Sequence, residues 1–149
     1  MRYERNASKE SAELKEFIKR FSTMKEMYEG TADGRPAVEI LIEKLDSFGN
    51  YLANTARLKT TQIRKFFSSV KKIQSELRSG RKATEPRQRI LRLKPALAYA
   101  TARQKKQLQE FTEVMYLAMD MVKKPEDFEY FVEFLEAIVA YHKFHGGKD

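Results

Sequence analysis

The chain has 149 residues, of which 42% are hydrophobic and 34% charged, a composition typical of a folded globular protein and not of a disordered one. The absence of cysteine excludes disulfides, thiolate catalysis and cysteine metal ligands, and we expect a cytoplasmic location. No apolar run approaches the roughly 20 residues that a membrane span requires, and the N-terminus is too charged for a signal peptide, so no membrane association is expected.

The first part of the chain has the apolar spacing of amphipathic helices. One helix is predicted from Ser8, its N-cap, to Tyr28. The sequence GTADGR (30–35) predicts a turn, and Pro36 suits the first position of a second helix. A glycine–asparagine pair at 49–50 is expected to end that helix.

A third helix is predicted from Thr60 or Thr61 to the Ser-Gly pair at 79–80. One face is apolar and is expected to be buried, with Ile63, Phe66, Phe67, Val70, Gln74 and Leu77. The opposite face carries two rows of cations: Arg64, Lys71 and Arg78, and beside them Lys65 and Lys72. A merely solvated helix would balance these cations with glutamates four residues away, but Glu76 is its one acid. The face therefore predicts binding of a polyanion.

Residues 81–88 (RKATEPRQ) are predicted to be a mobile linker, followed by a short helical piece. We expect a break at Lys94, because a residue before proline disfavours the helical conformation. Pro95 then begins a helix that runs to about Val122. Tyr99 in this helix is interpreted as a packed core tyrosine, the alternative being an exposed platform on which bases stack.

The last helix is predicted from Pro125 to the glycines at 146–147. It and the preceding helix each carry a second apolar stripe: Val114, Leu117 and Met121, and Tyr130, Phe134 and Tyr141. These stripes are either central in the bundle or contact a partner protein. Together the elements predict an all-α fold, a compact bundle of about five helices forming a single domain over residues 1–149.

The positive charge forms one block. Residues 57–106 contain 16 Lys and Arg against two acidic residues, whereas the remainder contains 13 against 19, for a net charge of +8. A block of one sign inside a foldable segment favours a polyanion site. No catalytic set is visible, because His142 and His145 belong to no HExxH motif and no glycine-rich phosphate loop follows a strand. We expect neither enzyme activity nor a cofactor or metal.

Three segments carry a family resemblance. TTQIRKFFSSVKKI (60–73), LRLKPALAYATAR (91–103) and FVEFLEAIVAYHKFHGGK (131–148) resemble, in order and approximate spacing, the small subunit of type III-A CRISPR effector (Csm) complexes. The resemblance covers about residues 60–149, and residues 1–59 contain no matching segment.

The resemblance implies a helical, non-catalytic subunit that is present in several copies and stacks inside an antiviral effector. Its implied partners are guide RNA, target RNA, the backbone and large subunits, and further copies of itself. The basic positions in the matched segments are the predicted RNA-binding residues: Arg64, Lys65, Lys71, Lys72, Lys94 and Arg103.

Three alternative functions have less support in the sequence. A helix-turn-helix DNA-binding protein would use TTQIRKFF as its recognition helix, but YLANTARLK before it offers no glycine for the tight turn, and Gln62 is its one early base-reading residue. A helical adaptor without nucleic acid is a further alternative. An enzyme on a helical bundle would require a convergent carboxylate–histidine set, which is not visible.

Overall fold

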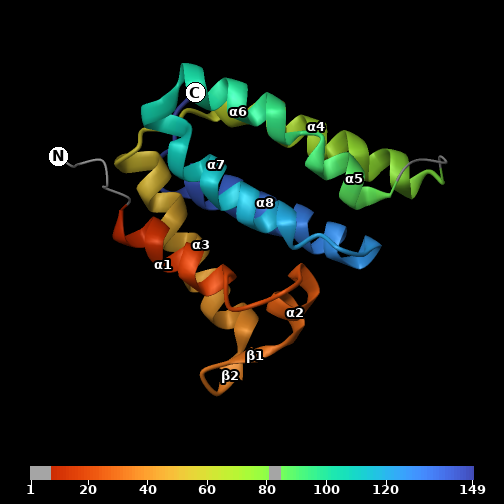
Figure 1. Ribbon diagram of the computed structural model, residues 1–149. Helices are drawn as coiled ribbons and strands as arrows, with labels where there is room; N and C mark the ends of the chain where they lie inside the picture. The colour runs from red at the N-terminus through yellow and green to blue at the C-terminus, as the bar shows by residue number, and fades with distance from the viewer. Residues whose placement is uncertain (1–7, 81–84) are drawn as a thin grey trace.

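The computed structural model describes residues 8–80 and 85–149, and these are mostly helical (Figure 1). The elements are α1 (Lys9–Ile18), α2 (Met24–Glu29), β1 (Thr31–Ala32), β2 (Arg35–Pro36), α3 (Ala37–Asn54), α4 (Thr60–Arg78), α5 (Pro86–Leu91), α6 (Lys94–Arg103), α7 (Lys105–Asp120) and α8 (Pro125–Phe144). The all-α prediction is confirmed. The prediction of about five helices is wrong, because two expected helices are divided and the expected short helical piece forms a helix of its own, α5.

The predicted first helix is two helices. Ser8 caps α1 as expected, since its Oγ accepts a hydrogen bond from the Ser11 N–H at 3.0 Å. Thr23 then acts as a second N-cap, and its Oγ1 accepts from the Glu26 N–H at 3.0 Å. An N-cap inside a continuous apolar stripe lets one helix end and a second helix begin in a new direction.

The predicted turn at 30–35 is a small hairpin in which β1 and β2 pair antiparallel. Its two central residues, Asp33 and Gly34, have φ angles of 54° and 80°. Positive φ at both positions is the requirement of a type I′ turn, for which Asp-Gly is a favoured sequence.

The prediction that residues 49–50 end the second helix is wrong. Gly49 lies buried inside α3, which continues to Asn54. A Cβ at Gly49 would lie 2.5 Å from Tyr141 Cβ and 2.9 Å from the His142 nitrogen. The glycine therefore permits close packing of α3 on α8 and does not terminate a helix.

The long helix predicted from Pro95 to Val122 is also divided. The break precedes Lys94, which is the first residue of α6, and α6 ends at Arg103. Gln104, with φ −129° and ψ 47°, separates α6 from α7. Of the predicted linker at 81–88, residues 86–88 belong to α5, whereas residues 81–84 lie outside the described part of the chain.

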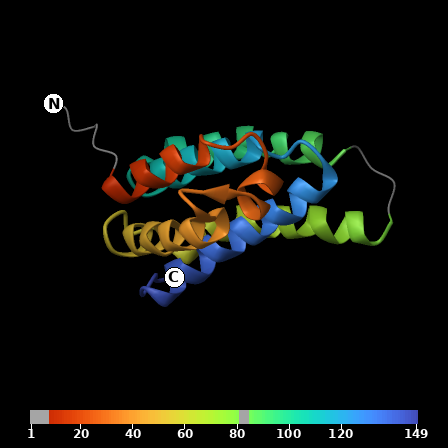
Figure 2. The same cartoon turned by 90° about the horizontal axis from the view of Figure 1, so that it is seen from below.

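The helices form two layers, with α1, α7 and α6 in one and α3, α8 and α4 in the other (Figure 2). Helix α7 packs against α1 and α6, and α8 packs against α3 and α4, with α2 added beside α3 and α8. The largest fully buried side chains are phenylalanines: Phe48, Phe111, Phe128, Phe131 and Phe134.

The second apolar stripes of α7 and α8 belong mainly to this core. Val114, Met121 and Phe134 are at most 5% exposed, and Leu117, Tyr130 and Tyr141 are partly buried against the core. Helices α1 to α3 cover α7 and α8, so the first third of the chain supplies the cover that these stripes require.

Two polar clusters hold α1 and α2 against α7 and α8. Asp127 is 2% exposed and accepts three backbone hydrogen bonds, from Lys25 at 2.8 Å, Lys123 at 3.0 Å and Lys124 at 2.9 Å, so one carboxylate joins the starts of α2 and α8. Lys15 on α1 donates to Glu110 at 2.7 Å and also to Glu113, both on α7. Burial alone would lower the pKa of Lys15, but these two carboxylates more than offset it and raise the pKa.

Candidate nucleic-acid interface

Helix α4 divides its faces as the sequence predicts. Its buried residues are Ile63, Phe66, Val70, Ile73 and Gln74, whereas Phe67 and Leu77 are partly buried. On the other side, Arg64, Lys65 and Lys72 are exposed. The predicted N-cap is displaced by one residue: Lys59 precedes the helix, and its N–H donates to the Gln62 side chain at 2.7 Å.

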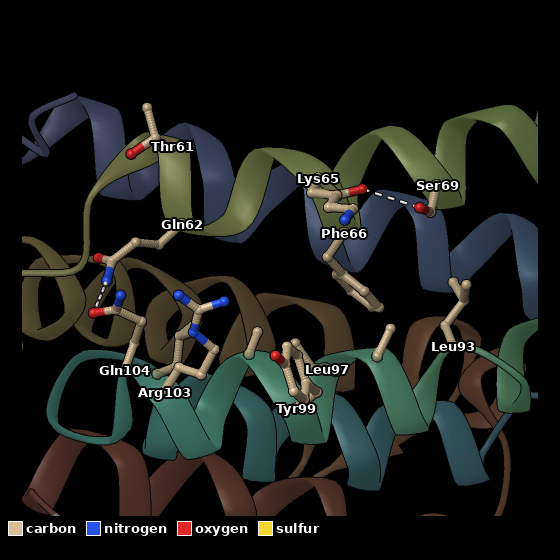
Figure 3. A pocket seen from close by; sticks show the side chains of 13 residues that line it. Thr61, Gln62, Lys65, Phe66, Ser69, Leu93, Leu97, Tyr99, Arg103 and Gln104 are labelled. Carbon is tan, nitrogen blue, oxygen red and sulfur yellow. Dashed lines mark hydrogen bonds between the residues drawn. The ribbon is translucent and has the colours of Figure 1, made fainter.

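A groove of about 430 Å³ lies between α4 and α6 (Figure 3). Helix α4 contributes Lys65 and Phe66, and α6 contributes Tyr99 and Arg103. One end is closed by Gln62, which donates to the Gln104 side chain at 3.2 Å. Among the described residues, no carboxylate lines this groove. The groove is therefore apolar, and the charged residues that line it are all cations.

The interpretation of Tyr99 as a core residue is wrong. Its side chain is 67% exposed, and the Arg103 guanidinium carbon lies 5.8 Å from the centre of its ring. The core-facing side of α6 consists of Leu97 and Thr101, which are buried, so Tyr99 lies on a different side of the helix. An exposed aromatic ring beside a cation matches the alternative that the sequence left open.

The six predicted RNA-binding residues have three different environments. Lys65 and Arg103 line the groove, one from each helix. Lys71 donates to Glu136 on α8 at 2.8 Å, and Lys94 donates to Asp120 on α7 at 2.9 Å. The remaining two, Arg64 and Lys72, are exposed and form no ion pair with any residue in 8–80 or 85–149. The structure therefore brings two of the six together in one groove.

Several cations of the basic block serve the fold. Arg78 donates to Glu129 at 2.9 Å, and Arg89 pairs with Glu76. Arg87 donates to the carbonyl oxygens of Asp120 and Val122 at the end of α7, at 3.2 and 2.8 Å. Charge counting could not separate these residues from ligand-binding ones.

Lys105 and Lys106, next to Arg103, are outside the six predicted residues. Both are exposed in the first turn of α7, which contains no acidic residue. Cations at a helix N-terminus oppose the helix dipole. The helix dipole disfavours Lys105 and Lys106 at this position, which is consistent with a role for these two lysines in ligand binding. The run of cations in ARQKK is the sequence signal that points to them.

A smaller hollow of about 230 Å³ lies just before the start of α4, and its lining includes Arg57, Lys59 and Lys148. The Lys148 carbonyl accepts from the Thr60 N–H at 2.8 Å, so the C-terminal residues lie against the start of α4. Within the described ranges there is no group of acidic or histidine side chains suited to a metal ion, and no helix there is long and apolar enough to span a membrane.

His142 is an interior structural residue, as expected for a histidine on the apolar stripe. It is 1% exposed, and its Nε2 lies 2.5 Å from the Leu58 carbonyl oxygen. A Cβ at Gly147 would overlap its ring, so the glycine at the end of the chain packs over the histidine.

Comparisons with known proteins agree with the sequence resemblance. The family model described as Csm2 Type III-A matches residues 35–148, which begins before the segment 60–149 and includes α3. A Streptococcus thermophilus protein named "CRISPR system Cms protein Csm2" is 35% identical over 111 residues, covering 73% of this chain and 85% of that protein. No solved structure matches. The chain therefore belongs to the Csm2 type III-A family, the CRISPR small-subunit family that its sequence resembles.

Proposed function

We propose that the chain is a non-catalytic subunit that binds guide and target RNA through their backbones, largely independently of sequence. The observation that carries the proposal is the set of exposed cations without ion pairs among the described residues of α4 and α6: Arg64, Lys65, Lys72 and Arg103. Phosphate contacts of this kind position a protein on a nucleic acid without reading its bases.

The assembly expected from the resemblance is part of the proposal. The subunit would stack as several copies beside the backbone and large subunits of the effector, in the cytoplasm, in antiviral defence. Family membership and the CRISPR name of the Streptococcus thermophilus relative support this assignment.

The salt dependence of binding tests the electrostatic mechanism. If about four phosphates are neutralised, the slope of log affinity against log salt for single-stranded RNA should be near −3, at about 0.7 per phosphate. Binding that hardly responds to salt, or that requires one duplex DNA sequence, would contradict the proposal.

Charge reversal tests the location of the site. The double variant Lys65→Glu and Arg103→Glu should weaken binding of single-stranded RNA by at least about tenfold and leave the melting temperature nearly unchanged, since exposed cations contribute little to stability. Lys19→Glu is the control, because Lys19 is an exposed cation at the C-terminal end of α1, outside the groove. Lys15 is unsuitable because Glu110 and Glu113 hold it. Equal loss in the control would mean diffuse charge attraction and no defined site.

The helix-turn-helix alternative has less support. Gln62, its one base-reading candidate, is engaged with Lys59 and Gln104. The helix before α4 is 18 residues long, not the short first helix that the motif requires. Failure of the chain to bind any RNA or DNA would favour the adaptor without nucleic acid.

A further inference from the structure

We propose that the groove between α4 and α6 binds one unpaired RNA base, which stacks on Tyr99 while Lys65 and Arg103 hold the adjoining phosphates. This inference rests on the proposed function and adds to it a preference for single-stranded or extruded nucleotides. The backbone contacts alone would not distinguish paired from unpaired RNA.

The shape of the groove is the first observation that supports a base-binding site. Its floor is apolar and includes the buried residues Phe66, Leu97 and Leu108. The α6 side is lined by alanines, Ala96 and Ala100, whose small side chains leave the space between the helices unfilled. The volume of about 430 Å³ falls within the range of pockets that bind small molecules.

The exposure of Tyr99 is the second observation. It is 67% exposed, although the other aromatic side chains of the described chain are buried or partly buried, apart from Phe144. Figure 3 shows Tyr99 and Arg103 projecting side by side from α6 at the edge of the groove. Aromatic side chains in this position stack on bases, and a neighbouring arginine adds a cation–π contribution.

Charge decides the class of ligand. Lys65 on α4 and Arg103 on α6 border the groove from opposite helices, and neither forms an ion pair within the described residues. A nucleotide supplies an aromatic ring for the apolar floor and a phosphate for these cations. An aromatic side chain from a protein partner would fill the hollow but leave both cations without an anion. The combination therefore favours a nucleotide.

Stacking on Tyr99 requires a base that is not part of a duplex. A base in a duplex is stacked on both faces and cannot also stack on a protein side chain. The base in the groove must therefore be unpaired or turned out of its helix. Because every base has an aromatic face, stacking tolerates any sequence, which agrees with the sequence-independent binding proposed above.

The test compares Tyr99→Ala with Tyr99→Phe. Binding of a uridine oligonucleotide to Tyr99→Ala should weaken by about fivefold or more, the loss typical for removing one base–aromatic stack. Tyr99→Phe keeps the ring and should bind within about twofold of the original protein. A fully paired RNA duplex should bind all three proteins alike. Phe144→Ala is the control, because Phe144 is 77% exposed and lies outside the groove.

A direct readout accompanies the affinities. An oligonucleotide of 5-iodouridine, irradiated in the complex, should crosslink to the α6 segment that contains Tyr99. Unchanged affinity in Tyr99→Ala, or crosslinks confined to other segments, would overturn the inference. It would also be overturned if Tyr99→Ala impaired assembly with other subunits and left RNA binding intact, because the groove would then bind protein.

These outcomes separate the inference from the proposed function. If reversal of Lys65 and Arg103 abolishes RNA binding and Tyr99→Ala does not alter it, the backbone site stands and the base pocket is wrong. If neither change alters RNA binding, both fail.

Discussion

The N-terminal region (8–54) and the α4–α6 region (60–80 and 85–103) use lysine and arginine in different ways. In the N-terminal region most cations form ion pairs that tie one element to another: Lys15 with Glu110 and Glu113, Arg20 with Asp33, Lys25 with Glu126, and Arg35 with Glu39 and Glu43. Within helices α4 and α6, four exposed cations form no ion pair with any described residue: Arg64, Lys65, Lys72 and Arg103. The two regions lie on opposite sides of α7 and α8 (Figure 1).

The difference shows why the number of cations is a poor guide to a binding site. A cation with a carboxylate at hydrogen-bond distance has its field largely neutralised, and it contributes to packing or to orientation of a loop. A cation without such a partner keeps its field for a ligand. The comparison therefore predicts that changes in the N-terminal region alter stability, whereas changes among the four exposed cations alter RNA binding.

The largest effect is expected at Asp127, which fastens the N-terminal region to α8. Asp127→Ala removes the acceptor of three buried backbone N–H groups and should lower the free energy of unfolding by about 3 kcal/mol, measured by urea denaturation. Glu126→Ala is the control, because its pair with Lys25 is exposed to solvent and contributes little to stability. A folded Asp127→Ala protein with weakened RNA binding would contradict the division of roles.

A matched pair of lysines gives the sharpest test. Lys15→Met leaves Glu110, whose side chain is 14% exposed, without its cation, and should cost about 2 kcal/mol of stability while RNA affinity is retained. Lys65→Met should change stability by less than about 0.5 kcal/mol and weaken RNA binding. Chemical denaturation and fluorescence anisotropy measure the two quantities. If both variants behave alike, the comparison between regions fails.

A smaller effect should distinguish neighbours on α4. Lys72 is exposed without an ion pair, whereas Lys71 donates to Glu136. Lys72→Gln should weaken RNA binding by about threefold, and Lys71→Gln by less, since its charge is already balanced. The same reasoning predicts a larger loss of RNA affinity for Arg103→Gln than for Lys94→Gln, because Lys94 forms an ion pair with Asp120. Equal effects within each pair would mean that RNA displaces Glu136 and Asp120 from their lysines.

The smallest effect concerns acid stability. Burial works to raise the pKa of Glu113, but hydrogen bonds from Lys15 and Gln109 outweigh it and lower the pKa below its ordinary value of 4.5. A lowered carboxyl pKa stabilises the fold above about pH 4.5, and that stabilisation is lost as the pH falls through the lowered value. The stability difference between the original protein and Lys15→Met should therefore shrink as the pH falls below 4.5. Denaturation series at neutral pH and near pH 3 measure it, and a constant difference would contradict the assignment.

Much of the fold could be predicted from local signals. The N-cap at Ser8, the helix start at Pro125 and the faces of α4 are confirmed. Helix α8 ends at Phe144, and Gly146 follows with a φ of 96°, the conformation for which glycine is preferred. Such features depend on residues within one helical turn of each other, so periodicity and capping chemistry reveal them.

The errors have a different origin. The sequence predicts that Gly49 ends a helix, but the glycine is required by the close approach of α8, more than 90 residues further along the chain. Tyr99 is interpreted as a core residue because most aromatic side chains in helical bundles serve packing. Only the packing of Leu97 and Thr101 decides which side of α6 is buried. Local propensity contains neither piece of information.

The helical class, the basic block and the family of the chain follow from the residue pattern alone. Which cations remain available to a ligand depends on the three-dimensional fold, because Lys71 pairs with Glu136, 65 positions away, and Lys94 with Asp120, 26 positions away. It also placed Lys65 and Arg103 beside one groove, although they are far apart in the chain. Charge neutralisation acts over a few ångströms in space, and distance along the chain does not specify it.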